Sequence, residues 1–521
     1  MWHKYFERRW YVLPVLSAGL LALSFFPFNY WAVGFVALVP LYYFVAAFPA
    51  RPWRHIVWGG FIVEAAFSLW FSYFTILRFH WIPSTYIFMD AVHLLSVPLA
   101  LLSGLLCGAL FTFLYRYLRS DSALLNVLAG AAAYTLGELL LYAVWNNYYY
   151  FAQLGYVAVS VRPFMILAGV GGVFFISFLV ALINCFIAEM LAAPEARRKL
   201  LSAGAALAVA VALLFFVNSH YASQRGAPIR SLSISILQGE AAGFGSMQGD
   251  AFSLPNLEPL LRGAAQTKPD ILLYPFSPVE GAFYQGQKTD FNKNILVAPA
   301  SSFGSWAADL VPTATTVVVW STLYTGQNFY NDLQFWKSGQ LSAEYRKQRP
   351  YPFLDYTPAW AERLGLYTTQ IDETRGPQGQ TLELNGVSAG GLICSEVHDQ
   401  DLARADAKDM ILFSAGTEAM FDSTVASNFS LDAARFRAAE NNIPVVRANI
   451  LGPSAIIGPD GSLIATLDAG RTGVLSGSVT LYAPRPTFFS QWGNLSIEIA
   501  VAAILLLAAA VRFKKREYKK D

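Results

Sequence analysis

The stretch PFMILAGVGGVFFISFLVALINCFIAEML (163–191) decides the fold class of this chain. Its 29 residues include one acidic residue, Glu189, and no basic residue. About 20 predominantly apolar residues are enough for a helix to cross the hydrocarbon core of a bilayer. The sequence therefore predicts a membrane-spanning helix here. The whole chain agrees with this, because only 14% of its 521 residues are charged and its mean hydropathy is +0.40.

Similar apolar stretches lie on both sides of this one. They are 11–28, 31–48, 56–77, 89–115, 123–144, 201–219 and 497–511. Between 225 and 490 no stretch is long enough to span a membrane. We therefore expect an α-helical membrane bundle of about eight transmembrane helices and one large domain outside the membrane. The expected boundaries are 1–222 for seven helices, 223–490 for the extramembrane domain, and 491–521 for the last helix with a basic tail.

The distribution of Lys and Arg predicts the orientation, because basic residues accumulate in cytoplasmic loops. Alternate loops and the two ends together carry sixteen cations, whereas the opposite short loops carry only Arg78 and Arg162. Both termini should therefore be cytoplasmic and residues 223–490 extracytoplasmic. The first span has no small-residue cleavage signature, so we interpret it as a retained helix. The sixteen are Lys4, Arg8, Arg9, Arg51, Arg54, Arg116, Arg119, Arg197, Arg198, Lys199, Arg512, Lys514, Lys515, Arg516, Lys519 and Lys520.

The extramembrane segment alternates apolar runs with helical patterns. The runs lack polar–apolar alternation, which is typical of strands covered on both faces and indicates an α/β layered domain. The clearest helical pattern is 428–442, and 456–466 reads as a hairpin with an Asp-Gly turn. The predicted strands are 231–238, 271–275, 294–300, 315–324, 390–394, 410–415 and 444–450.

Several kinds of site are disfavoured. GVSAG (386–390) matches a serine-hydrolase elbow, but that motif requires a helix after the serine, and here the strand-like GLIC follows. Only His398 follows Ser388 as a possible triad histidine. The six histidines and three cysteines do not fall at metal-ligand spacing, and no glycine-rich phosphate motif occurs. The net charge of +2 gives no electrostatic argument for nucleic-acid binding.

Cys394 and Lys347 are the candidate reactive residues of the outer domain. Cys394 is its only cysteine and ends a predicted strand, two residues before Glu396, so it is either an activated nucleophile or a core thiol. Lys347 ends a predicted hairpin (330–336 and 340–347), where it is either a positioned cation or a solvated surface lysine. In the membrane part, Glu64 and Glu138 are functional candidates by default, with helix-to-helix bonding favoured for Glu138.

Together these stretches resemble the apolipoprotein N-acyltransferases, membrane-bound members of the nitrilase superfamily. The family pattern Y-x-K-x-x-x-x-P-F-x-E-Y-x-P is similar to Tyr345, Lys347, Pro352, Phe353, Asp355, Tyr356 and Pro358. The family's C-x-E resembles Cys394 and Glu396, and its A-R-x-R-A-x-E helix resembles 434–440. The stretches 444–461, 23–41, 137–139 and 153–156 also resemble family segments. The resemblance implies an αββα sandwich for the outer domain.

The chain departs from the family pattern at the expected general base. Nitrilase-type sites use a Glu, Lys, Cys triad, and the position that resembles the Glu is occupied here by Phe276. Glu280, in the loop after the same strand, and Glu240 and Glu418, at the ends of other strands, are candidate replacements. Alternatively the base is lost, and Lys347 alone lowers the pKa of the thiol. The acidic residue of the lysine loop is shortened to Asp355, and Ser395 replaces the aromatic residue that usually follows the cysteine.

The resemblance implies that Cys394 takes an acyl chain from a phospholipid as a thioester and passes it to the α-amine of a diacylated N-terminal cysteine on a lipoprotein. Lys347 would hold the oxyanion, Glu396 would support the site, and Asp355 and Tyr345 would contribute to substrate binding. No cofactor or metal is expected, and we expect a monomer in the bacterial cytoplasmic membrane. The alternatives are a membrane-anchored nitrilase-type amidase or other acyltransferase, and a non-catalytic lipid- or lipoprotein-binding relative.

Overall fold

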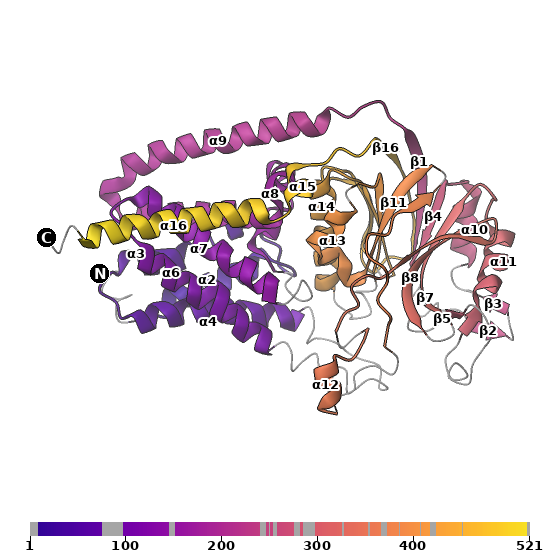
Figure 1. The fold of residues 1–521 in the computed structure, drawn as a ribbon, viewed down its shortest axis with the longest axis horizontal. Coiled ribbons are helices and arrows are strands. Elements are labelled where there is room, and N and C mark those ends of the chain that lie inside the picture. Colours follow the sequence, from indigo (N-terminus) through magenta and orange to yellow (C-terminus); the bar gives the residue numbers. More distant parts are fainter. Residues whose placement is uncertain are drawn as a thin grey trace. The chain divides into compact units, whose positions relative to one another are not determined.

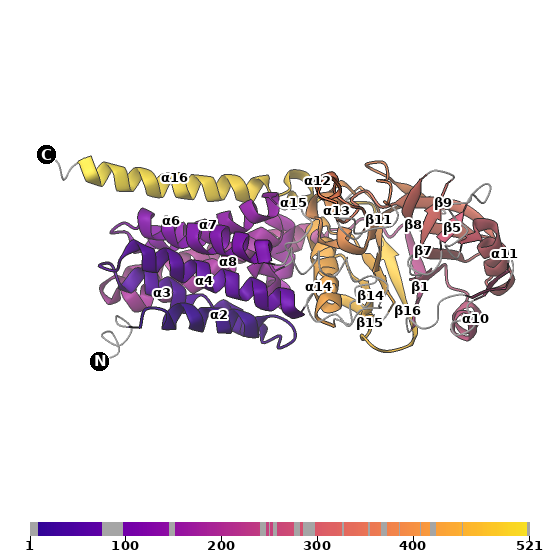
Figure 2. The ribbon, with the colours of Figure 1, turned by 90° about the horizontal axis from the view of Figure 1, so that it is seen from below.

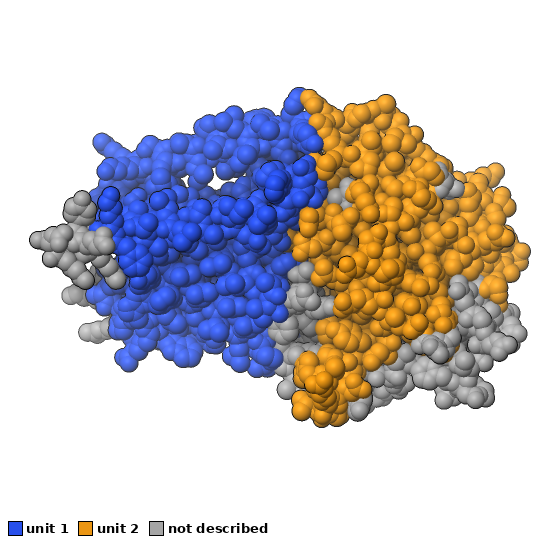
Figure 3. All heavy atoms as spheres, in the orientation of Figure 1, with its two compact units in different colours: residues 1–77, 93–223, 487–521 blue, residues 78–92, 224–486 orange. Residues whose placement is uncertain are grey.

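The computed structural model forms two compact units, shown in Figure 3: residues 1–77, 93–223 and 487–521, and residues 78–92 and 224–486. Each is described by itself. Residues described are 9–74, 97–144, 152–239, 246–248, 251–253, 258–275, 282–284, 297–325, 328–352, 355–365, 372–384, 386–406, 408–416, 424–450 and 452–517.

The first unit is helical throughout its described part (Figure 1). Six helices are long and apolar enough to cross a membrane, and two shorter apolar helices, Val12–Ser24 and Trp31–Ala47, lie at the first two predicted spans. Each of the eight predicted stretches therefore contains a helix in its described part. The first, α2, has 13 residues and rises only about 20 Å, which is less than the roughly 30 Å of a bilayer core. The six long helices are Trp53–Ser72 (α4), Val97–Leu118, Ala123–Val144 (α7), Arg162–Ala192 (α8), Pro194–Ser223 and Leu495–Lys514.

Two glycines allow a close helix contact inside this unit. A π-helical segment, η4 (Gly104–Leu110), lies in the fourth span, and its Gly108 faces Gly60 of α4 so closely that a Cβ on either would overlap with the other's carbonyl group. Small residues permit such backbone approach between membrane helices, where packing replaces the hydrophobic driving force. α4 and η4 are thereby held together without large side chains.

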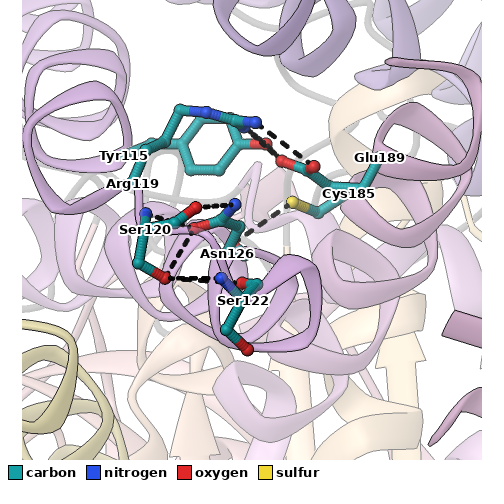
Figure 4. Close-up of polar contacts among 7 residues, drawn as sticks. All are labelled: Tyr115, Arg119, Ser120, Ser122, Asn126, Cys185 and Glu189. Atoms are coloured by element: carbon teal, nitrogen blue, oxygen red, sulfur yellow. Dashed lines mark hydrogen bonds and ion pairs between the residues drawn. The ribbon is translucent and has the colours of Figure 1, made fainter. Parts of the chain in front are cut away.

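A buried acid of this unit pairs with a cation and accepts a hydrogen bond from a hydroxyl group (Figure 4). Glu189 of α8 accepts a hydrogen bond from the hydroxyl of Tyr115, 2.5 Å away in α6 (Phe111–Leu118), and pairs with Arg119 at the end of α6. Cys185 donates to the carbonyl oxygen of Asn126 at 3.8 Å. Since Glu189 is fully buried, this pairing is what makes its charge tolerable, and it joins α6 to α8.

The two intramembrane acids singled out in the sequence also connect elements. The hydroxyl of Tyr134 in α7 donates to Glu64 in α4 at 3.2 Å. Glu138 in α7 accepts the backbone N–H of Leu154 at 2.7 Å, from the 3-10 segment η5 (Leu154–Ala158). The bonding between elements that was favoured for Glu138 is thus present in the structure.

The second unit contains two large β-sheets, seen from two directions in Figures 1 and 2. One sheet has the order β16-β1-β4-β7-β5-β6, with β8 and β9 attached through β7, and the other runs β10-β11-β12-β13-β14-β15. The first consists of β1 (Arg230–Gln238), β4 (Ile271–Tyr274), β5 (Ala282–Tyr284), β6 (Val297–Pro299), β7 (Thr316–Tyr324), β8 (Phe329–Lys337), β9 (Gln340–Arg346) and β16 (Gly473–Leu481). The second consists of β10 (Leu382–Leu384), β11 (Val387–Ile393), β12 (Ile411–Gly416), β13 (Val445–Asn449), β14 (Ser454–Ile457) and β15 (Leu463–Leu467). A separate small pair is β2 (Ser246–Gln248) with β3 (Ala251–Ser253).

The sheets pack face to face, and helices cover their outer faces. One apolar core joins Ile234 and Val318 of the first sheet to Phe413 and Val446 of the second. A second core lies between the first sheet and the helices α10 (Glu258–Gln266) and α11 (Ala300–Leu310). The helix α14 (Thr424–Asn441) packs on β13 and β14 of the other sheet, beside α13 (Gln400–Ala405). The expected αββα sandwich is therefore present.

The predicted strands agree with described strands to within a few residues, whereas β2, β3, β5, β10 and β16 were not predicted. All of GVSAG except its first glycine lies in β11, where Ser388 pairs with Glu383 of β10, and the strand continues to Ile393. No helix follows the serine, so the serine-hydrolase interpretation is excluded. The β8–β9 hairpin turns at Ser338 and Gly339, both with positive φ, and delivers Lys347 directly after β9.

The contact between Gly391 of β11 and the buried ring of Tyr345 is specific to glycine. A Cβ on Gly391 would overlap with the ring of Tyr345, which is fully buried. We predict that Gly391→Ala lowers the stability of the full-length protein by about 1–3 kcal/mol, because overpacking forces backbone or ring displacement. Thermal unfolding in detergent measures this.

Gly263→Ala in α10 is the matched control, since a Cβ there meets no atom within 4 Å. Alanine is favoured over glycine within helices by about 1 kcal/mol. The control should unfold at the same temperature as the natural protein or slightly higher. Equal melting temperatures for the two variants would show that the Gly391–Tyr345 contact does not constrain the sandwich.

Candidate active site

Cys394 sits at the abrupt end of strand β11. It is 8% exposed and has φ of +53°, a left-handed conformation that costs a non-glycine residue about 1–2 kcal/mol. The chain turns here from the strand into the 3-10 segment η9 (Cys394–His398). Such strain persists only where surrounding contacts hold it, and it is concentrated at functional sites.

The carboxylate of Glu396 provides those contacts. It is almost fully buried and accepts hydrogen bonds on both oxygens. Oε2 accepts the backbone N–H of Ile393 at 2.8 Å, just before the cysteine, and the hydroxyl of Tyr345 at 3.1 Å. Oε1 accepts the backbone N–H groups of Gln348 at 2.7 Å and Arg349 at 2.9 Å. One side chain therefore fixes the cysteine turn to the segment that follows Lys347.

Burial raises the pKa of Glu396 to about 7, although the backbone N–H donors and the Lys347 charge act in the opposite direction. Since both oxygens already accept hydrogen bonds, the carboxylate is committed to holding the two loops. Its geometry suits a supporting role beside the cysteine, which stays a prediction from the family resemblance.

Lys347 is a buried cation with a fixed position. It is 1% exposed, its backbone N–H donates to the carbonyl oxygen of Asn331 at 2.8 Å, and its ammonium group pairs with Asp355. Asp355 also accepts the backbone N–H of Tyr351 at 2.5 Å. Burial acts to lower the pKa of Lys347, but the charges of Asp355, Cys394 and Glu373 raise it overall. Lys347 therefore stays protonated, and its charge belongs to the same electrostatic network as the cysteine.

A helix supports the cysteine turn from the other side. Arg437 and Glu440 of α14 are both fully buried and form an ion pair at 2.6 Å. Arg437 also donates to the carbonyl oxygen of His398, at the end of η9, at 3.2 Å. Removing one partner of such a pair would leave a buried charge uncompensated. The A-R-x-R-A-x-E pattern thus has a structural explanation here.

Glu373 is a further residue of the site, and the sequence reasoning missed it. Asn331 in β8 donates from its side chain to Glu373 Oε1 at 3.3 Å, and the backbone N–H of Glu373 donates to the carbonyl oxygen of Asp355 at 2.8 Å. Burial is the largest influence on the Glu373 carboxyl and, together with the Asp355 charge, raises its pKa to about 8. The only sequence signal was an acidic residue between the lysine loop and the cysteine strand.

The structure therefore brings together Tyr345, Lys347, Asp355, Cys394 and Glu396. Phe276, Glu240, Glu280 and Glu418 lie outside the described residues. Within the described part of the chain, no group of three or more His, Cys, Asp or Glu side chains could hold a metal ion.

This arrangement suits nucleophilic acyl chemistry. A cysteine at a strained turn can attack a carbonyl carbon, and a buried ammonium group can stabilise both a thiolate and the oxyanion that forms. A carboxyl group with a raised pKa can exchange protons near neutral pH.

Two family models match most of the chain. Residues 17–186 match the apolipoprotein N-acyltransferase N-terminal domain, and residues 269–485 match the carbon-nitrogen hydrolase domain. The first match covers most of the helical unit. The second match contains Lys347, Glu373 and Cys394.

Two curated proteins are similar to this chain over most of its length. Apolipoprotein N-acyltransferase of Pseudomonas paraeruginosa is 25% identical over 497 residues, which is 90% of this chain and 89% of that protein. The Rhizobium etli protein of the same name is 24% identical over 530 residues, covering 94% and 95%. Among solved structures, Saccharomyces cerevisiae Nit3 of the nitrilase superfamily is 14% identical, covers 50% of this chain and 93% of its own, and has a TM-score of 0.35. With both family domains present in this order, the chain belongs to the apolipoprotein N-acyltransferases, the membrane-bound members of the nitrilase superfamily.

Proposed function

We propose that this chain moves an acyl chain from a phospholipid, through a thioester on Cys394, to the α-amine of the N-terminal diacylglyceryl-cysteine of a lipoprotein. The observation that carries the proposal is the shared charge network of Cys394, Lys347 and Asp355 on a chain with long apolar helices. The names of its relatives, apolipoprotein N-acyltransferases, support the same activity.

In the first step the Cys394 sulfur attacks the ester carbonyl of the phospholipid. A carbon–sulfur bond forms, the ester carbon–oxygen bond breaks, and the lysophospholipid leaves with a proton on its hydroxyl oxygen. Lys347 stabilises the negative oxygen of the tetrahedral intermediate, because its buried ammonium group needs no reorganisation during the reaction. Loss of one such donor typically lowers kcat about 100- to 1,000-fold.

In the second step the free α-amine of the lipoprotein attacks the thioester. An amide bond forms, the carbon–sulfur bond breaks, and Cys394 recovers its proton. Thioesters react with amines far more readily than oxygen esters do, so the covalent intermediate divides one difficult transfer into two easier ones. The apolar helices suit these substrates, because both carry acyl tails that stay in lipid.

The role of Cys394 is tested by trapping its acyl adduct. We predict that the natural protein, mixed with bacterial phospholipid vesicles, gains the mass of one acyl chain on Cys394, and that Cys394→Ser abolishes transfer to a synthetic diacylglyceryl-cysteine lipopeptide. Serine is small enough to replace the cysteine without disturbing the fold. Its hydroxyl group, however, is not ionised near neutral pH. Mass spectrometry of the intact protein measures the adduct.

Cys185→Ser is the matched control. Cys185 is fully buried in the helical unit and donates to the Asn126 carbonyl oxygen, a bond that a serine hydroxyl can also make. This variant should keep transfer activity. Full transfer by Cys394→Ser would remove the thioester mechanism. An adduct that yields only free fatty acid in the presence of the lipopeptide would point to an amidase-type hydrolase instead.

We propose further that the chain is a multi-pass protein of the inner membrane, with both termini in the cytoplasm and the sandwich domain on the periplasmic side. This proposal rests on the sixteen cations on one side against Arg78 and Arg162 on the other. It places the site on the side of the membrane where mature lipoproteins lie.

Reporter fusions test this orientation. A reporter that is active only outside the cytoplasm should be active when fused after position 300 and inactive when fused at the C-terminus. A cytoplasmic reporter should give the reverse pattern at the same two positions. Equal signals at both positions would contradict the proposed orientation and the odd number of crossings between them.

A further inference from the structure

Three carboxylates surround Lys347, and they differ in how their oxygens are used. Asp355 pairs with the Lys347 ammonium group and also accepts a backbone N–H from Tyr351. Glu396 accepts hydrogen bonds on both oxygens. Glu373 accepts one bond on Oε1, while its Oε2 is shielded from solvent and has no hydrogen-bond partner among the described residues. Of the three, Glu373 is the one with a carboxylate oxygen that is buried and has no hydrogen-bond partner among the described residues.

The surroundings of Glu373 hold its carboxyl group in place. Its backbone bridges to Phe329 at the start of β8 and donates to the Asp355 carbonyl oxygen. The Asn331 side chain that donates to Glu373 accepts in turn from the indole N–H of the buried Trp320. This chain of bonds fixes the amide orientation of Asn331, so Glu373 is supported in the way that catalytic groups require.

Asp332 is another buried acid nearby that has no hydrogen-bond partner among the described residues, but it forms a 3.9 Å ion pair with Arg346 and faces a different layer. Successive side chains on a strand point to opposite faces. In β8, Leu333 and Phe335 pack in the core between the sheets, whereas Trp336 packs against the outer helices. Asp332 lies four residues before Trp336 and therefore on the same face of β8. Asn331 lies two residues before Leu333 and therefore on the opposite, inner face. Asp332 therefore lies on the outer face, away from Cys394 in the inner core.

The charges around Glu373 favour proton exchange near neutral pH. Burial and the negative charge of Asp355 raise its pKa, Lys347 lowers it, and Glu396 raises it further, which gives a pKa of about 8. Asp332 contributes a weaker interaction from the outer face. General acid–base catalysis is efficient when the pKa of the catalytic group lies near the working pH.

We propose that Glu373 is the general base of this site, replacing the glutamate that the family pattern places where this chain has Phe276. The inference rests on the proposed function. Glu373 takes the proton from the Cys394 thiol, directly or through one water molecule, as sulfur bonds to the ester carbon. It then gives this proton to the departing lysophospholipid oxygen. In the second step Glu373 takes a proton from the attacking amine and returns it to the Cys394 sulfur.

The test measures the rate of Cys394 acylation as a function of pH in the full-length protein with vesicles of bacterial phospholipid. In the natural protein the rate should rise as pH passes through about 8, because a base acts only when deprotonated. Glu373→Gln should lower the rate at pH 7 by about 100-fold or more and replace the inflection at about 8 by a rise at higher pH, where the unassisted thiol ionises. Glu373→Asp keeps a carboxylate and should retain the inflection with part of the rate.

Glu362→Gln in α12 (Ala359–Arg363) is the control, since Glu362 is an exposed acid outside the site. It should match the natural protein at every pH. Glutamine at 373 can still accept from Asn331, and thermal unfolding of each variant checks that the fold persists. An unchanged rate in Glu373→Gln, or a uniform loss with the inflection retained, would overturn the role of Glu373 and leave the proposed function intact. If Cys394 of the natural protein is never acylated, both proposals fail.

Discussion

The carboxylate of Glu396 is the point on which the site depends, because it joins two segments that the chain keeps about 50 residues apart. It bonds the backbone before Cys394 and the backbone after Lys347, and it lies beneath the Tyr345 ring that Gly391 allows to approach. Hydrogen bonds to charged groups contribute about 1.5–3 kcal/mol each. Glu396 accepts four such bonds, and together they outweigh the cost of about 1–2 kcal/mol for the left-handed conformation of Cys394.

The three carboxylates near Lys347 make different contacts and therefore have different roles. Glu396 holds the loops, Asp355 balances the Lys347 charge, and Glu373 has a buried oxygen without a hydrogen-bond partner among the described residues. A buried lysine with a single paired carboxylate remains cationic, so it can act on an oxyanion without exchanging a proton. Proton transfer is the role that we propose for Glu373, whose pKa is raised to about 8.

The sequence predicted what local patterns determine. Hydropathy located all eight apolar helices, and strand patterns with turn residues located the β8–β9 hairpin that positions Lys347. It overestimated the first span, because apolar residues continue past the end of α2 at Ser24. Glu373 could not be found in this way, since its place in the site comes from contacts with Asn331 and Asp355 and follows no periodicity. Phe276 departs from the family pattern at the expected base, and this departure alone does not point to Glu373.

The most direct test of the whole account is the mass of lipoprotein N-termini in a strain from which this chain has been deleted. Mature lipoproteins of this strain should carry two acyl chains and a free α-amine. Restoring the natural chain should add the mass of one amide-linked acyl chain. Lipoproteins that remain fully N-acylated in the deletion strain, or that stay diacylated after the chain is restored, would contradict it.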